Sequence, residues 1–207
     1  KAGHPDLTTP HVSRLSARDL LADLAQSLEF LRTDHVDLLW LHRDDPAVAV
    51  GEIVEAMNLV IASGQARYVG CSNWRAARIR AANAYAQAHG LNGFVASQPQ
   101  WSLAQPNRAA LSDPERLVVF GPQERDLHWK TGIAVIPYSP QAQGYFDKLE
   151  RLGEAALSDK DRQGYHSAAN AAMLPTVKAL AARHGVSINA LSLSWLMSQP
   201  FVTIPVV

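Results

Sequence analysis

Polar side chains stand at the carboxyl ends of successive apolar runs in this chain. His42 ends the first run, Ser72 and Asn73 follow the second, Gln98 follows the third, and Tyr138 and Ser139 follow the fourth. A neutral imidazole at a strand end can donate its N–H to a carbonyl oxygen as negative charge develops there. Hydroxyl and amide groups offer both donors and acceptors, which is what a ligand carboxamide needs. The pattern predicts one polar pocket lined by these residues.

A metal site is a second possibility at the same place. His42, Asp44 and Asp45 supply imidazole and carboxylate groups, which are suitable ligands for several divalent ions. The two aspartates are adjacent in a loop, however, and no second histidine stands at a matching strand end. Metal-dependent hydrolysis is therefore the less favoured alternative, and we expect no metal ligands.

The elements that must position these residues alternate along the chain. The predicted strands are Val36–Leu41, Ala66–Cys71, Phe94–Ser97, Ile133–Pro137 and Val202–Val207. The predicted helices are one capped by Ser13 or Ser16 and running to Leu31, then Val48–Ser63, Trp74–His89 capped by Asn73, Gln123–Lys130, Ser167–His184 and Ser187–Ser198. We expect residues 141–166 to form a long loop.

Alternating helices and strands are typical of βαβ units and a parallel sheet. An open doubly wound sheet needs a glycine-rich phosphate turn, and no G-x-G-x-x-G or G-x-x-x-x-G-K-[ST] occurs. In a TIM-type (β/α)8 barrel all strand ends open onto one face, where the active site lies. We therefore predict an α/β fold of barrel type, with about five of its strands in a single partial domain over residues 1–207.

The composition narrows the class of partner. The 207 residues carry 19 Lys plus Arg against 19 Asp plus Glu, so no basic excess favours nucleic acid or a membrane surface. No apolar run approaches the roughly 18 residues of a membrane span. Cys71 is the only cysteine, which excludes an internal disulfide and fits a reducing cytoplasm. We expect a cytoplasmic protein, with Cys71 as an inert apolar residue in its strand.

Four stretches of the chain resemble the aldo-keto reductase family. They are SLEFLRTDHVDLLWLH (Ser27–His42), GQARYVGCSN (Gly64–Asn73), ASQPQWSL (Ala96–Leu103) and GIAVIPYSP (Gly132–Pro140). They occur in the family's order and at its spacing. The resemblance covers most of the chain.

The resemblance implies a (β/α)8 barrel that binds NADPH or NADH and reduces a small aldehyde or ketone by hydride transfer. It gives His42 and Lys1 catalytic roles, His42 orienting or polarising the carbonyl and Lys1 tuning a tyrosine. It gives the nicotinamide carboxamide to Ser72, Asn73 and Gln98, ring stacking to Tyr138, and a cofactor phosphate to Ser139. Channel β subunits share the fold and bind nucleotide as partners in an assembly, so a non-catalytic role is an alternative.

The resemblance also implies partners for these residues that are not in this sequence. The family's catalytic Asp and Tyr are expected before Lys1, and its adenosine-phosphate segment after Val207. We therefore expect the chain to be the middle portion of a reductase, and inactive alone if it is truly truncated.

Overall fold

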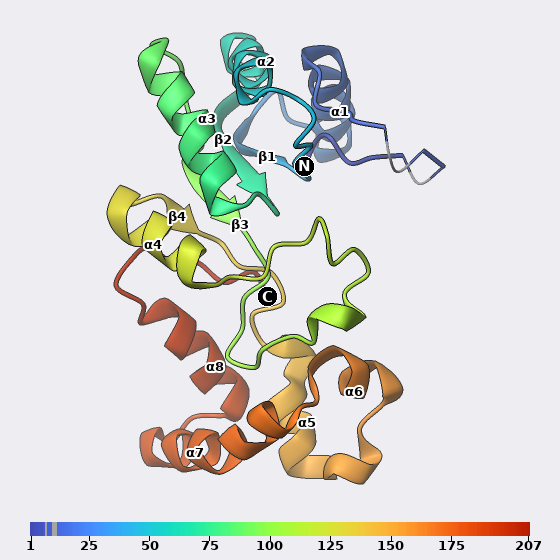
Figure 1. Cartoon of the computed structure of the whole chain (residues 1–207), viewed down its shortest axis with the longest axis vertical. Coiled ribbons are helices and arrows are strands. Elements are labelled where there is room, and N and C mark those ends of the chain that lie inside the picture. The colour runs from blue at the N-terminus through green and yellow to red at the C-terminus, as the bar shows by residue number, and fades with distance from the viewer. Residues whose placement is uncertain (7, 10–11) are drawn as a thin grey trace. The chain divides into compact units, whose positions relative to one another are not determined.

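The computed structural model describes residues 1–6, 8–9 and 12–207, which form two compact units. The first unit contains Lys1–Gln98 and Gly121–Ala134, and the second contains Pro99–Phe120 and Val135–Val207. Helices alternate with parallel strands, so the predicted α/β class is confirmed (Figure 1). The single domain over residues 1–207 stays a prediction.

A parallel sheet runs through the first unit. Its strand order is β1-β2-β3-β4, with β1 at Val36–Leu41, β2 at Ala66–Ser72, β3 at Ala96–Gln98 and β4 at Ala134–Val135. Leu41 is level with Cys71, and Ser72 is level with Gln98. Ala2 extends the sheet beyond β1, because its amide donates to Trp40 O at 2.8 Å and its carbonyl accepts from His42 N at 2.9 Å. The carboxyl ends of neighbouring strands therefore lie at one level.

Four helices of the first unit follow one another as neighbours. They are α1 (Ala17–Leu31), α2 (Val50–Ala62), α3 (Ala76–Ala88) and α4 (Pro122–Thr131) (Figure 1). Ser16 caps α1 as one of the two predicted residues, since its hydroxyl accepts from Asp19 N at 3.2 Å. The predicted cap at Asn73 is wrong. Arg75 stands at the start of α3, and Asn73 instead takes a left-handed conformation with φ 57°.

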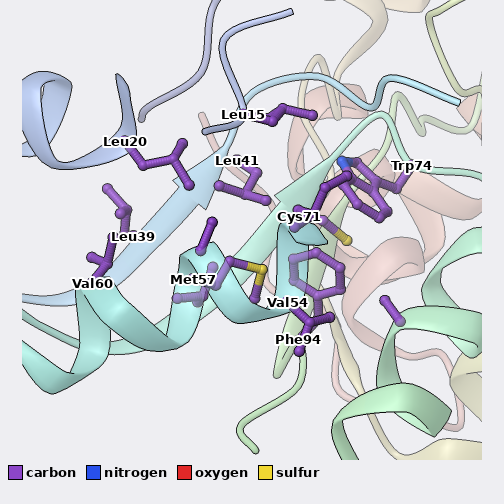
Figure 2. Close-up of a cluster of buried hydrophobic side chains, with 14 of the residues drawn as sticks. Leu15, Leu20, Leu39, Leu41, Val54, Met57, Val60, Cys71, Trp74 and Phe94 are labelled. Atoms are coloured by element: carbon purple, nitrogen blue, oxygen red, sulfur yellow. The ribbon is translucent and has the colours of Figure 1, made fainter. Parts of the chain in front are cut away.

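The apolar core of the first unit lies on one face of the sheet. Figure 2 shows Leu39 and Leu41 of β1 with Cys71 of β2 against Val54 and Met57 of α2. Side chains alternate along a strand, so the residue after each of these points to the opposite face. Trp40 and Gly70 illustrate this, because a Cβ on Gly70 would lie 2.6 Å from the Trp40 ring. His42, Ser72 and Gln98 are in step with Trp40 and Gly70, so they share the face of the sheet opposite to the core against α2.

The second unit is mainly helical. It contains α5 (Tyr145–Leu152), α6 (Asp159–Tyr165), α7 (Ala168–His184) and α8 (Ile188–Met197), with 3-10 turns at Arg108–Ala110, Ala142–Gly144 and Glu154–Ala156. The predicted loop over residues 141–166 is wrong, since α5 and α6 lie within it. Tyr145, Phe146 and Leu149 bury one side of α5, and their helical spacing was a signal that the prediction missed. Pro175 lies inside α7 without dividing it.

The prediction of a last strand over Val202–Val207 is wrong. Only Thr203 forms a parallel bridge, with Val135. The flanking segment still pairs in the expected direction, because Ile204 N donates to Val135 O at 2.9 Å and Val206 N donates to Pro137 O at 3.0 Å. Among the described residues, no helix combines the length and the apolar character that crossing a membrane requires.

Candidate active site

His42 lies directly after β1 and is half-buried. Its ring packs against His4 with 4.4 Å between ring centroids. The pKa of His42 is lowered to about 4, mainly by burial and then by the positive charges of Arg43, His4 and Lys1. The ring is therefore neutral near pH 7, with one N–H donor and one acceptor. No described residue forms a hydrogen bond with either ring nitrogen, so both can serve a ligand.

Lys1 stands beside His42 at the edge of the sheet. Its neighbour Ala2 forms an isolated parallel bridge with Leu41, which places Lys1 beside the carboxyl end of β1. The pKa of the Lys1 side chain is lowered by partial burial and by the nearby charge of Arg43. The structure thus brings the two predicted catalytic residues within electrostatic range of each other.

Ser72, Asn73 and Gln98 form one connected group at the ends of β2 and β3. The Ser72 hydroxyl donates to Gln98 O at 3.0 Å and the Asn73 side-chain amide donates to the Ser72 hydroxyl at 3.2 Å. The left-handed turn at Asn73 lets its backbone N–H also donate to Gln98 O, at 3.2 Å. These bonds hold the Ser72 and Asn73 side chains against the backbone at the end of β3.

Gln98 is one of three described residues with a buried side-chain polar atom that forms no hydrogen bond, with Ser13 and Trp74. Its amide oxygen Oε1 is buried, and no described group donates to it. A buried acceptor without a donor costs about 1 to 3 kcal/mol, so such atoms are rare unless something binds them. An N–H donor such as the amide of a carboxamide would satisfy Oε1. This group of residues therefore fits the nicotinamide end of a dinucleotide.

Tyr138 and Ser139 belong to the second unit. The Tyr138 amide donates to Pro99 O at 3.1 Å, and its side chain is half-buried. Ser139 has a left-handed backbone with φ 53°, and its side chain forms a hydrogen bond with Tyr165. The two units are described separately. Stacking of Tyr138 on the nicotinamide and binding of a phosphate by Ser139 therefore stay predictions.

The two aspartates of the possible metal site accept hydrogen bonds from other groups of the protein. Asp44 accepts two hydrogen bonds from Arg78, at 2.9 and 3.0 Å, and Asp45 accepts from Ala47 N at 3.0 Å. In the described ranges, no three His, Cys, Asp or Glu residues gather as a metal site would require. Cys71 is fully buried, and burial raises the pKa of its thiol, as expected of an unreactive core residue.

Sequence reasoning missed several polar residues. His128 of α4 is fully buried, with Nε2 at 2.8 Å from the Ser97 hydroxyl and Nδ1 at 2.6 Å from Ile133 O. It joins α4 to β3 and has a structural role. His4 and Arg43 were not among the predicted site residues, although Arg43 directly follows His42 in the sequence.

A cavity of about 470 Å³ lies within the second unit. Its polar lining includes Gln100, Asn107, Ser112, Lys160, Gln163 and Tyr165. Three of these six, Lys160, Gln163 and Tyr165, came from the region predicted as loop. None was a predicted site residue.

A parallel α/β fold with polar side chains at the ends of its strands is the arrangement of barrel enzymes. The chain belongs to the aldo/keto reductase family, whose model matches residues 2–207. The family that the four sequence stretches indicated is thus confirmed.

Three similar proteins illustrate the range of the family. The chain is 29% identical to norsolorinic acid reductase B of Dothistroma septosporum, over 93% of this chain and 46% of that protein. It is 28% identical to a probable voltage-gated potassium channel subunit beta of Oryza sativa, over 94% of this chain and 58% of that protein. A thermostable aldo-keto reductase solved with the inhibitor epalrestat superposes with a TM-score of 0.62 at 25% identity, covering 94% of this chain and 57% of that one. The chain spans about half the length of these relatives.

Proposed function

We propose that the protein reduces aldehydes or ketones to alcohols, with NADPH or NADH supplying the hydride when bound. Membership of the aldo/keto reductase family supports an oxidoreductase. The observation that carries the proposal is the buried, unpaired Gln98 Oε1 beside Ser72 and Asn73, at the level of a neutral His42.

In this proposal His42 holds the substrate carbonyl. A neutral imidazole N–H donates to the carbonyl oxygen more strongly as that oxygen gains negative charge, which stabilises the transition state. The low pKa of His42 keeps the ring from becoming an imidazolium at neutral pH. Lys1 would supply the cation that lowers the pKa of the tyrosine that the family uses. That tyrosine would donate the proton to the carbonyl oxygen.

Ser72, Asn73 and Gln98 would hold the carboxamide of the nicotinamide. Gln98 Oε1 would accept from its N–H, and the Ser72 and Asn73 groups would orient it. Tyr138 would stack on the nicotinamide ring. Ser139 would donate to a cofactor phosphate in place of its present hydrogen bond with Tyr165.

The test is aldehyde-dependent oxidation of NADPH and NADH by the complete protein that contains these residues, over a broad panel of aldehydes and ketones. Binding of each cofactor is measured in parallel by quenching of tryptophan fluorescence. Turnover together with cofactor binding supports the proposal. Absence of both contradicts it.

A second candidate is a nucleotide-binding partner subunit with little or no turnover. It is favoured by the similarity to proteins named as potassium channel β subunits of Oryza sativa and Arabidopsis thaliana. The same experiment separates the two, because tight cofactor binding without oxidation of NADPH by any carbonyl compound would indicate the partner role.

A further inference from the structure

Arg78 lies in the first turn of α3, and its guanidinium reaches back to the loop that follows β1. It donates to both carboxylate oxygens of Asp44, at 2.9 and 3.0 Å, and to the backbone oxygens of Asp45 and Val48, at 3.1 Å each. The ion pair is mostly buried, with 22% of the Arg78 side chain and 10% of the Asp44 side chain exposed. Arg78 therefore holds this loop through both a side chain and the backbone.

The same guanidinium lies over the indole ring of Trp74, with its central carbon 5.4 Å from the ring centroid. Trp74 directly follows Asn73 and is buried, and its ring packs edge-on against Phe94 with 4.8 Å between centroids (Figure 2). A cation over the face of a tryptophan is attracted by the ring electrons, more strongly when water is excluded. Arg78 is thus held between the loop after β1 and the turn after β2.

These two segments carry the two parts of the proposed site. His42 lies two residues before Asp44 at the end of β1, and Asn73 lies directly before Trp74 at the end of β2. The paired register of β1 and β2 runs as far as Leu41, so the separation of the segments beyond it depends on side chains. A planar guanidinium with five N–H groups suits this role, because it can bond in several directions at once.

We propose that Arg78 is a positioning residue, which sets the distance between His42 and the Ser72–Asn73 pair. The inference rests on the proposed function, because a carbonyl held by His42 must lie against the nicotinamide held by Ser72 and Asn73. Reacting atoms must approach to about 3 to 3.5 Å, and a misplacement of about 1 Å can lower the rate by about 10²-fold. Because Arg78 acts through these residues, its loss should affect the chemical step more than the binding of the cofactor.

The first test measures kcat and KM for 4-methylbenzaldehyde, and the dissociation constant of NADPH by calorimetry, in the complete protein. Arg78→Met removes every contact of the guanidinium, and Arg78→Lys keeps a charge beside Asp44 without the paired hydrogen bonds. The matched control is Arg80→Met, which changes an arginine of the same helix that pairs with Asp126 at 2.7 Å.

We expect kcat to fall by about 10- to 100-fold in Arg78→Met and by about 3- to 10-fold in Arg78→Lys, with the dissociation constant of NADPH within about 3-fold of the parent value. Arg80→Met should leave kcat unchanged. Urea unfolding is measured alongside, because Arg78→Met leaves Asp44 without its counter-ion, and Arg78→Lys decides the test if Arg78→Met does not fold. Variants of Arg78 that are less stable but turn over as fast as the parent would overturn the inference.

NMR separates this inference from the proposed function. If the parent reduces no aldehyde, the proposed function fails, and the His42 ring and Asn73 side-chain amide resonances are compared in the parent, Arg78→Lys and Arg80→Met. Both resonances should shift in Arg78→Lys, which keeps the local charge, and neither should shift in Arg80→Met. That result supports the positioning role on its own, and an unchanged resonance of either residue in Arg78→Lys overturns it.

Discussion

Gln98 and Gln100 are separated by a single residue, yet their amides are used differently in the two units. In the first unit, Gln98 Oε1 is buried with no donor. In the second, the Gln100 amide nitrogen donates to the Tyr165 hydroxyl at 3.0 Å. The first glutamine retains binding capacity for a ligand, whereas the second stabilises the protein itself.

The same contrast extends to other polar side chains. In the first unit, the ring nitrogens of His42 and the guanidinium of Arg43 are left without acidic or hydrogen-bonding side-chain partners among the described residues. In the second, Asn170 joins two segments by bonding Gln105 and Tyr165. A polar residue is thus a better site candidate when its hydrogen-bonding capacity remains unused than when it is merely buried.

The largest effect is expected from His42→Ala. A positioned acid or donor contributes about 10² to 10⁴ in rate, so kcat/KM for aldehyde reduction should fall by that factor while NADPH affinity changes little. The matched control is His35→Ala, which changes an exposed histidine at the opposite end of β1. Equal losses in the two variants would show that His42 has no special role.

In the second unit, Asn170→Ala should act on stability. Asn170 accepts from Gln105 N at 3.0 Å and donates to Gln105 O at 2.8 Å and Tyr165 O at 2.6 Å. Removing it leaves several buried groups unpaired, so the free energy of unfolding in urea should fall by about 2 to 4 kcal/mol. Asn189→Ala on α8, which has no such bonds, should change it by less than about 0.5 kcal/mol. Similar losses would contradict the structural role.

The two glutamines give opposite expectations when each is replaced by methionine. Gln98→Met removes an unpaired buried oxygen, so stability should be unchanged or slightly higher, while cofactor affinity falls by about 3- to 10-fold. Gln100→Met removes the donor to Tyr165, so the free energy of unfolding should fall by about 1 kcal/mol with cofactor affinity unchanged. For both variants, fluorescence titration measures the cofactor affinity and urea unfolding measures the free energy of unfolding. The comparison fails if the two variants behave alike.

Much of the first unit could be predicted from the sequence, because its strands and helices carry regular apolar patterns. The strand at Val36–Leu41 is found as predicted, and the helix after Ser16 begins where a serine can cap it. Lys1, His42, Ser72 and Gln98 could be placed together because the ends of parallel strands meet at one level. The left-handed turn at Asn73 could not be predicted, since asparagine suits both a helix cap and that conformation.

The second unit was less predictable because long-range contacts shape it. Helix α6 has only Tyr165 as a large apolar residue and so shows no period. In α5 the apolar residues recur at helical spacing, and the signal was missed because the segment is short and rich in charges. The partners of Gln98 and Arg43 were also beyond reach, because the absence of a hydrogen bond or ion pair depends on where every other side chain lies.

The smallest expected effect is a shift in the titration of His42, and it tests whether the first unit keeps its charged groups unpaired. The pKa of His42 is about 4, below the ordinary value of 6.5, with burial as the main cause and Arg43 next. An unfolded chain therefore takes up a proton near pH 6.5 that the native protein takes up only near pH 4, so His42 makes the free energy of unfolding fall as the pH is lowered through that window. Arg43→Gln removes one repulsive charge, so the pKa should rise while staying below 6.5, because burial remains. The change is followed by NMR of the ring proton resonances, with Arg18→Gln as the control. An unchanged pKa in Arg43→Gln would mean that the guanidinium charge does not act on the imidazole.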